Sequence, residues 1–263
     1  MLRRLLPLLV LLSGCAHPPS SRDTTNAILW VQASAEYEVA VRQSYVLAAR
    51  RLDEALAAAP AAPAVVMDLD ETVLDNSGFE AGLIRRDEEF ALEAWHRWLA
   101  GTGARAMPGA VEFVAEARRR GAAVLFVTNR HERYRAPTLA TLQGLGLAAE
   151  GPSEAWLLMR GQRPEWGTDK ASRREAAAAG HAVVLLVGDD LNDFVPCLGL
   201  DPPARKALVA ENAQRFGREW VLVPSPSWGS WLDALHGYRE DLSPAEMREL
   251  RLRWLKPDEA GSR

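Results

Sequence analysis

The sequence predicts an α/β protein: a doubly wound, Rossmann-like parallel sheet with a small helical cap and a long N-terminal helix. Five short apolar runs lack period-two alternation, which is typical of strands buried on both faces. Helical stretches separate these runs, as the crossover connections of parallel strands require. The chain has 263 residues, 48% hydrophobic and 25% charged, which is enough apolar material for one full-sized domain with an insert.

The N-terminus has the pattern of an export signal. The stretch MLRRLLPLLVLLSGC begins with two arginines, continues with an apolar run too short to span a bilayer, and ends in small residues. We therefore predict a signal peptide at residues 1–14. The LSGC ending also resembles a bacterial lipoprotein box, in which Cys15 is lipidated; the alternative is a plain signal peptide. Because Ala16 follows where an aspartate would retain the protein in the inner membrane, we expect an outer-membrane lipoprotein facing the periplasm or the cell surface.

A tether and a helical segment follow. Residues 15–25 are rich in proline and serine and are predicted to be the lipidated tether. Residues 26–63 form the predicted N-terminal helical segment, because apolar residues recur at spacings of three and four from Tyr37 to Leu56. The pattern indicates one long helix from Ile28 to Leu56, ended by the Ala/Pro-rich residues after it.

The main domain is predicted over residues 64–240, with a C-terminal helical tail at 241–263. An insert at 75–107 interrupts the first strand–helix unit and is predicted to be a cap, with Trp95 and Trp98 in its own core. The strands are predicted at the apolar runs 64–67, 122–127, 155–159, 182–187 and 220–223.

Polar residues stand where three of these strands end, and a lysine opens the helix before the fourth strand. These residues are Asp68, Asp70, Thr128, Asn129, Lys170, Asp189 and Asp193. In open parallel sheets ligands bind beyond the carboxyl ends of the strands, so we expect one shared site. Taken alone, DLDET could be an Asp-rich surface turn, GDDLND is a weak signal, and Lys170 could be a solvated residue that opens a helix.

The residue types fit phosphoryl transfer. Asp68 and Asp189, with the backbone carbonyl of Asp70, offer the oxygen ligands that Mg²⁺ prefers. Asp68 could then attack phosphorus and form an aspartyl-phosphate, while the Asp70 side chain serves as general acid and base. The Thr128 hydroxyl and the Asn129 N–H could hold a phosphoryl oxygen, and Lys170 could neutralise charge on nucleophile and phosphate.

The order of these motifs also resembles a known family. DLDET, VTNR, a lysine and GDDLND follow one another as the four motifs of the haloacid dehalogenase superfamily do, with the paired aspartates of its DDDD phosphatases. Further stretches (NAILW, DETVLDNS, MPGAVEF and PSPSWGSW) are similar to the class C acid phosphatases, the outer-membrane lipoprotein acid phosphatase/5′-nucleotidase family. The likeness covers roughly residues 26–235.

The resemblance implies a haloacid dehalogenase-type fold, with Asp68 as nucleophile and Asp70 as acid and base. It implies phosphate binding by Thr128 and Lys170, a metal ligand at Asp189, and an acid of the metal site at Asp193. The metal residues are then Asp68, Asp70, Asp189 and Asp193. The implied activity is Mg²⁺-dependent hydrolysis of phosphomonoesters at mildly acidic pH, often of nucleoside 5′-monophosphates or nicotinamide mononucleotide.

The resemblance further implies that aromatic rings recognise the base of the substrate. Trp228 occupies one aromatic position of the family. The opposite stacking position aligns with Leu52, which is not aromatic, and Phe79 is either a substitute contact or part of the cap core.

Two alternatives stay open: a phosphotransferase with the same aspartyl-phosphate, and a non-catalytic surface-binding lipoprotein of the haem or adhesin type. The expected partners are a small phosphomonoester and the membrane at Cys15, and a homodimer is left open. The net charge of −4 and the lack of a Lys/Arg cluster argue against a nucleic-acid polymer. Cys197 is expected to be a packed small apolar residue rather than a nucleophile.

Overall fold

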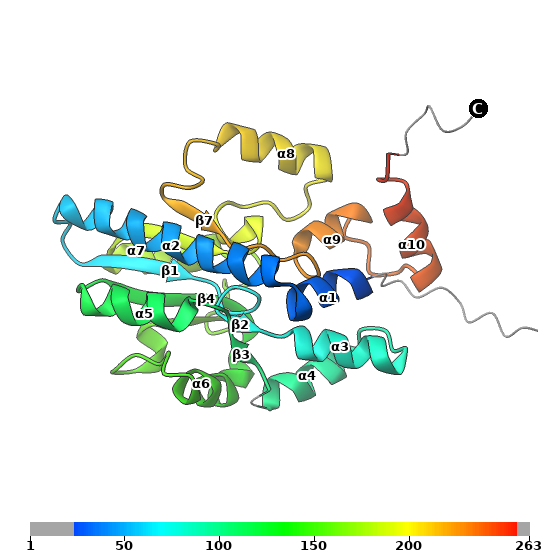
Figure 1. Cartoon of the computed structure of the whole chain (residues 1–263), viewed down its shortest axis with the longest axis horizontal. Helices are drawn as coiled ribbons and strands as arrows, with labels where there is room; N and C mark the ends of the chain where they lie inside the picture. The colour runs from blue at the N-terminus through cyan, green and yellow to red at the C-terminus, as the bar shows by residue number, and fades with distance from the viewer. Residues whose placement is uncertain (1–23, 102, 257–263) are drawn as a thin grey trace, which may run out of the picture.

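A five-stranded, fully parallel sheet forms the centre of the protein, seen in a computed structural model that describes residues 24–101 and 103–256 (Figure 1). The strand order is β5-β4-β1-β6-β7. The strands are β1 (Pro63–Met67), β4 (Ala123–His131), β5 (Leu157–Arg160), β6 (Ala182–Gly188) and β7 (Trp220–Leu222). Every strand of this sheet overlaps one of the predicted apolar runs, so the predicted sheet is confirmed. Strand β4 runs on to His131, so Thr128 and Asn129 lie within it and not after it.

Helices cover both faces of the sheet, as a doubly wound fold requires. In Figure 1, α2 (Ala35–Ala57) and α5 (Ala110–Arg119) lie in front of the sheet and α7 (Ala171–Gly180) lies behind it. The central strand β1 is accordingly buried from Ala64 to Met67. The predicted α/β class is therefore confirmed.

The predicted long helix is present as α2, but it does not begin at Ile28. The chain breaks at Ser34, whose backbone is extended (φ −89°, ψ 136°), so that α1 (Thr25–Ala33) is a separate helix. The Ser34 side chain accepts a hydrogen bond from the Tyr37 N–H at 3.1 Å, which caps the first turn of α2. Apolar periodicity runs across this break, and for that reason the pattern alone suggested one helix.

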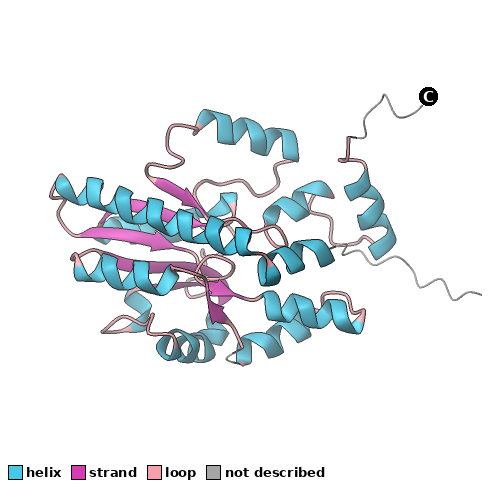
Figure 2. Cartoon of the chain, in the orientation of Figure 1, coloured by secondary structure: helices cyan, strands magenta, loops and turns pink. Residues whose placement is uncertain are grey.

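The insert contains two helices and a small antiparallel pair of strands. These elements are β2 (Leu74–Asp75), α3 (Ser77–Arg86), α4 (Leu92–Ala100) and β3 (Arg105–Ala106). They lie together at one end of the sheet, where Figure 2 shows the two helices beside the two short strands. The insert therefore sits where it can cover the carboxyl ends of the strands.

The other elements connect the strands or follow the sheet. They are η1 (Glu132–Tyr134), α6 (Arg135–Gly144), η2 (Ser153–Ala155), η3 (Leu191–Asp193), α8 (Pro202–Glu211), α9 (Ser230–Leu235) and α10 (Pro244–Leu252). The predicted signal peptide 1–14, Cys15, all but the last two residues of the tether, and residues 257–263 lie outside the described residues. Within the described part of the chain, no helix has both the length and the apolar character needed to cross a bilayer.

Candidate active site

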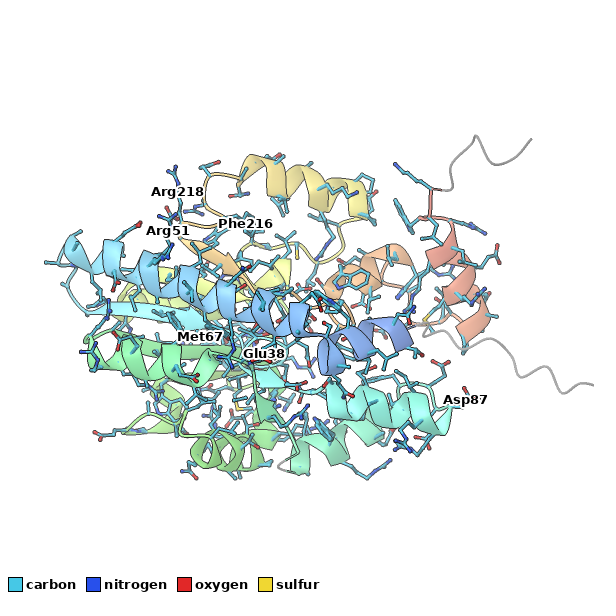
Figure 3. All side chains as sticks on the ribbon, viewed as in Figure 1. Glu38, Arg51, Met67, Asp87, Phe216 and Arg218 are labelled. Atoms are coloured by element: carbon cyan, nitrogen blue, oxygen red, sulfur yellow. The ribbon has the colours of Figure 1, made fainter. Side chains whose placement is uncertain are left out.

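The carboxyl ends of the strands open into a cavity of about 840 Å³. Figure 3 labels Met67, the last residue of β1, in the middle of the molecule, and the chain reaches the cavity with the next residue. The predicted site residues that line the cavity are Asp68, Asp70, Asn129, Lys170, Asp189, Asp193 and Trp228. Segments up to 160 residues apart in the sequence thus meet in one place, because parallel strands end at the same edge of a sheet.

Three carboxylates and one lysine form the carboxylate centre, which we define as Asp68, Asp189, Asp193 and Lys170. One oxygen of each aspartate lies within 4.8 Å of the others. The Lys170 ammonium is 2.6 Å from Asp68 Oδ1 and 2.6 Å from Asp193 Oδ1. A single positive charge therefore faces three carboxylates.

The charge imbalance shifts the pKa values of the carboxylate centre. Burial raises the pKa of Asp68 to about 7, although Lys170 acts in the opposite direction. Burial also raises the pKa of Asp189 well above its usual range, and the nearby Asp193 and Asp68 add to this. Burial opposes the charged form of Lys170, yet Asp193 and Asp68 raise its pKa above the usual value. The protein alone leaves the carboxylate centre short of positive charge.

The carboxylate centre fits a divalent cation. Its three carboxylates are hard oxygen donors, and a cation would supply the missing positive charge. The local backbone supports this arrangement: a Cβ at Gly188 would lie 2.2 Å from Asp193 Oδ2, so only glycine lets that carboxylate approach. Thr72 Oγ1 donates to Asp189 Oδ1 at 2.8 Å and fixes the orientation of that side chain.

Asp70 lies outside this group of carboxylates and has its own partners. Both of its oxygens accept hydrogen bonds from Arg130, at 2.7–3.0 Å, and Oδ1 also accepts from Asn76 Nδ2 at 2.8 Å. Arg130 is itself buried, with its side chain 3% exposed. The Asp70 side chain is therefore held in the cavity wall, outside the group of Asp68, Asp189 and Asp193 that could share a metal. Its predicted roles as a metal residue and as general acid and base stay predictions.

Thr128 and Asn129 are placed differently from each other. Asn129 lines the cavity, whereas Thr128 is fully buried and does not. The Thr128 hydroxyl oxygen accepts the Arg130 N–H at 3.0 Å. The buried Arg173 holds this segment from behind, donating to the Thr128 carbonyl and to Asn129 Oδ1. Phosphate binding by Thr128 stays a prediction.

Trp228 belongs to an aromatic wall of the cavity, which we define as Phe90, Trp95 and Trp228. Its ring centre lies 5.3 Å from that of Phe90 and 6.1 Å from that of Trp95, the latter at 26° between planes. All three residues line the cavity. Trp95 was expected in the cap core, and it does pack on Phe79 at 5.2 Å while also forming part of the wall.

The stacking position assigned to Leu52 is wrong. Leu52 lies on α2 in the hydrophobic core, 1% exposed, and is not part of the cavity lining. Phe79 is 7% exposed and packs on Phe90, Trp95 and Trp98, so of its two interpretations the cap core is the correct one. The aromatic residues that do pack against Trp228 are Phe90, which precedes α4, and Trp95, which lies on α4.

The comparisons with known proteins agree with this geometry. The family model of the haloacid dehalogenase superfamily, subfamily IIIB (acid phosphatase), matches residues 16–231. The chain belongs to this family. The structure of the class C acid phosphatase from Bacillus anthracis is similar, with a TM-score of 0.82 and 31% identity over 88% of this chain and 96% of that one. Its crystal structure with tungstate bound matches with a TM-score of 0.81, at the same identity and coverage.

The acid phosphatase assignment confirms the predicted family, fold and enzyme class. This chain is a phosphomonoesterase, and the phosphotransferase and binding-protein alternatives are not needed to explain it. Members of the superfamily depend on a metal, and the carboxylate centre offers a place for one.

Three residues of this acid phosphatase site escaped the sequence analysis. Arg130 follows Asn129 directly, so the VTNR motif contained the signal, but its partner Asp70 is 60 residues away. Arg173 has no local signal. Asp190 accepts from the Ser230 N–H at 2.6 Å and from the Ser230 hydroxyl, and so ties the GDDLND turn to the segment that carries Trp228.

Cys197 is as predicted. Its thiol is buried, with the residue 1% exposed, and burial raises its pKa to about 11. A thiol with this pKa stays protonated at neutral pH and is a poor nucleophile. The cysteine packs beside Arg205, away from the carboxylate centre.

Proposed function

We propose that this acid phosphatase is Mg²⁺-dependent and hydrolyses nucleoside 5′-monophosphates or nicotinamide mononucleotide through an aspartyl-phosphate on Asp68. The observation that carries the proposal is the position of Asp68. It lies in the carboxylate centre, in contact with Lys170, in the same cavity as the aromatic wall. A phosphate at Asp68 and a base against Trp228 would use both parts of this cavity.

The first step is attack of an Asp68 carboxylate oxygen on phosphorus. The P–O bond of the ester breaks as the new P–O bond to Asp68 forms, and the leaving alkoxide takes a proton from Asp70. Lys170, 2.6 Å from Asp68, offsets the negative charge that gathers on nucleophile and phosphoryl oxygens. A divalent cation held by Asp68, Asp189 and Asp193 would supply further positive charge to the phosphoryl group.

The second step returns the enzyme to its starting state. Asp70 takes a proton from water, the water oxygen attacks phosphorus, and the bond to Asp68 breaks to release inorganic phosphate. Arg130 and Asn76 keep Asp70 oriented through both steps. An oxyanion such as tungstate, which is bound in the related Bacillus anthracis enzyme, would occupy the phosphate position here and inhibit competitively.

The base of the substrate is assigned to the aromatic wall. A purine, pyrimidine or nicotinamide ring offers a flat face to Trp228, Phe90 and Trp95, and stacking of this kind tolerates different bases. This supports a range of nucleotides rather than one base.

The test measures hydrolysis of p-nitrophenyl phosphate, AMP and nicotinamide mononucleotide by wild type and Asp68→Asn, with Mg²⁺ and with EDTA. We expect Asp68→Asn to lose at least about 10³-fold in kcat, because an amide is not a nucleophile toward phosphorus. When wild type is mixed with substrate labelled in its phosphate and quenched in acid, the protein should carry labelled phosphate as an acyl phosphate on Asp68. Hydroxylamine should release this label. Full activity of Asp68→Asn would refute the nucleophile assignment, and transfer of phosphate to added alcohols in preference to water would favour the phosphotransferase.

We also propose that the chain is exported and lipidated at Cys15, which anchors it to the outer membrane. The support is the sequence alone: a basic start, a short apolar run and LSGC. Cells expressing the full chain should incorporate labelled palmitate into it, and Cys15→Ser should abolish the label and release the protein from the membrane fraction. Label retained in Cys15→Ser would contradict the proposal.

A further inference from the structure

One guanidinium in the cavity wall has no ion-pair partner among the residues that the structure describes. Arg160 closes β5 and lines the cavity. Its Nε is sealed from solvent and makes no hydrogen bond, and in the described part of the chain no carboxylate pairs with it. Two other arginines of the lining, Arg130 and Arg239, bind Asp70 and Asp241. A half-buried cation left without an anion is unfavourable, so Arg160 needs a ligand from outside the chain.

The strand order places Arg160 at the opposite edge of the sheet from β7, the strand that precedes Trp228. In the order β5-β4-β1-β6-β7, Arg160 ends one edge strand, Asp68 follows the central strand, and Trp228 follows the other edge strand. Neighbouring strands lie about 4.8 Å apart, so the backbone of Arg160 lies about 10 Å from that of Asp68 along the sheet. A substrate with its reacting phosphate at Asp68 and its base at Trp228 would have Arg160 on its third side.

The charged groups that act on His131, beside Arg160, are mainly positive, and His131 itself is held in its neutral form. His131 is its neighbour in the β4–β5 register and also lines the cavity. Burial lowers the pKa of His131, and the charges of Arg160 and Arg133 lower it further. The nearest acid on this segment, Glu132, is engaged by Arg135 through two hydrogen bonds of 2.6 Å. This side of the cavity therefore favours an anion.

We propose that Arg160, with His131 beside it, forms a second anion subsite that binds a second phosphate group of the substrate. The inference rests on the proposed nucleotide phosphatase function and extends its substrate class to nucleoside bisphosphates, which carry phosphates on two ribose hydroxyls. In the proposed mechanism the reacting phosphate lies beside Lys170 and the aspartates of the carboxylate centre. Arg160 has no part in that mechanism. A guanidinium is suited to a phosphate because it can donate two parallel hydrogen bonds.

The experiment compares adenosine 3′,5′-bisphosphate with AMP as substrates, with removal of the 5′-phosphate followed by chromatography of the products. In wild type we expect a higher kcat/KM for the bisphosphate. Arg160→Gln should lower the ratio of the two kcat/KM values about tenfold, since the loss of a charged hydrogen bond costs about that factor. Its kcat/KM for AMP should stay within about threefold of wild type. Arg160→Lys should keep part of the preference.

The matched control is Arg218→Gln, which removes one positive charge from an exposed position that Figure 3 shows at the periphery of the molecule. It should leave the ratio unchanged. Thermal melting of each variant separates a folding defect, which would lower activity on both substrates, from a change in the ratio.

If the ratio of kcat/KM for the bisphosphate to kcat/KM for AMP were the same in wild type and Arg160→Gln, the proposed subsite would be refuted. The proposed phosphatase function would still stand. If wild type hydrolysed neither nucleotide, the proposed function would fail, and equilibrium dialysis of both nucleotides would still decide the subsite. If wild type binds the bisphosphate more tightly than AMP and Arg160→Gln does not, the subsite is supported. If both proteins bind the bisphosphate equally well, the subsite is refuted.

Discussion

The carboxylate centre and the aromatic wall face the same cavity but are held in different ways. Each group of the carboxylate centre has fixed polar partners: Lys170 bridges two aspartates at 2.6 Å, and Thr72 holds the third. The aromatic wall consists of rings from the cap and from the segment after β7, which touch mainly through ring faces and edges. The carboxylate centre is therefore fixed by the sheet, and under the proposed function substrate choice depends on side chains that can change without disturbing it.

After the loss expected for Asp68→Asn, the largest effect is expected at the lysine of the carboxylate centre. Lys170→Gln removes the only cation that touches Asp68 and Asp193 among the described residues, and so removes charge stabilisation at the reacting phosphate. We expect kcat for p-nitrophenyl phosphate to fall about 10²–10³-fold in saturating Mg²⁺. Steady-state kinetics at several Mg²⁺ concentrations would measure this.

The control for this variant is Lys170→Arg, which keeps the charge. It should fold as wild type does and retain more activity than Lys170→Gln. A Lys170→Gln enzyme with unchanged kcat would show that the lysine is only structural, and the division between the two regions would then be wrong.

Removal of the metal should lower the stability of the folded protein, and the size of this loss should depend on pH because of the carboxylate centre. The folded pKa of Asp68 is raised to about 7, above its unfolded value, so the metal-free folded state binds more protons between about pH 4 and pH 7. Its free energy of unfolding should therefore fall as the pH rises through this window. We expect Tm in EDTA to drop by about 5 °C more than in Mg²⁺ between pH 5 and pH 7.5.

Differential scanning calorimetry of wild type and Asp68→Asn would check this result. The variant lacks the titrating carboxylate, so the EDTA-specific drop should shrink. Identical pH profiles in EDTA and Mg²⁺ would mean that no cation binds among these aspartates.

The two regions also differ in how far the sequence predicts them. Asp68 and Asp189 could be assigned to one site because each directly follows an apolar run, and parallel strands end at a common edge. Phe90 could not be matched with Trp228, because their contact depends on how the cap folds over the sheet. The pairing of Arg130 with Asp70 was missed for a similar reason, since Arg130 alone is only a polar side chain near the end of β4 and Asp70 is only a polar side chain after β1.

The break at Ser34 teaches a related point about helices. The sequence contains the capping signal, a serine three residues before Tyr37, but apolar spacing continues through it and favoured one helix. Tertiary contacts resolve the conflict, because α1 packs on α3 of the cap while α2 packs on α5 and the sheet.

A moderate effect, confined to substrate choice, is expected in the aromatic wall. Trp228→Ala should lower kcat/KM for AMP about 10- to 100-fold, the range of one base–aromatic stack. For ribose 5-phosphate, which has no base, kcat/KM should change less than about threefold. Trp254→Ala, at an exposed tryptophan outside the cavity lining, is the control and should change neither value. Equal losses on both substrates would place Trp228 in the chemistry rather than in base recognition.

The smallest effect is expected where the N-terminal helix supports the carboxylate centre. The Tyr45 hydroxyl on α2 donates to the Thr72 carbonyl at 2.6 Å, and the Thr72 hydroxyl in turn donates to Asp189. Tyr45→Phe leaves that buried carbonyl without its donor, which should cost about 1–3 kcal/mol in the free energy of unfolding. Urea denaturation would measure the loss, with Tyr238→Phe as a control because its hydroxyl accepts from Arg205 and donates to the Cys197 carbonyl, contacting no residue of the carboxylate centre. If Tyr45→Phe also weakens activation by Mg²⁺ and Tyr238→Phe does not, α2 orients the turn that carries Asp189. If neither variant changes activation by Mg²⁺, the carboxylate centre is held by the sheet alone.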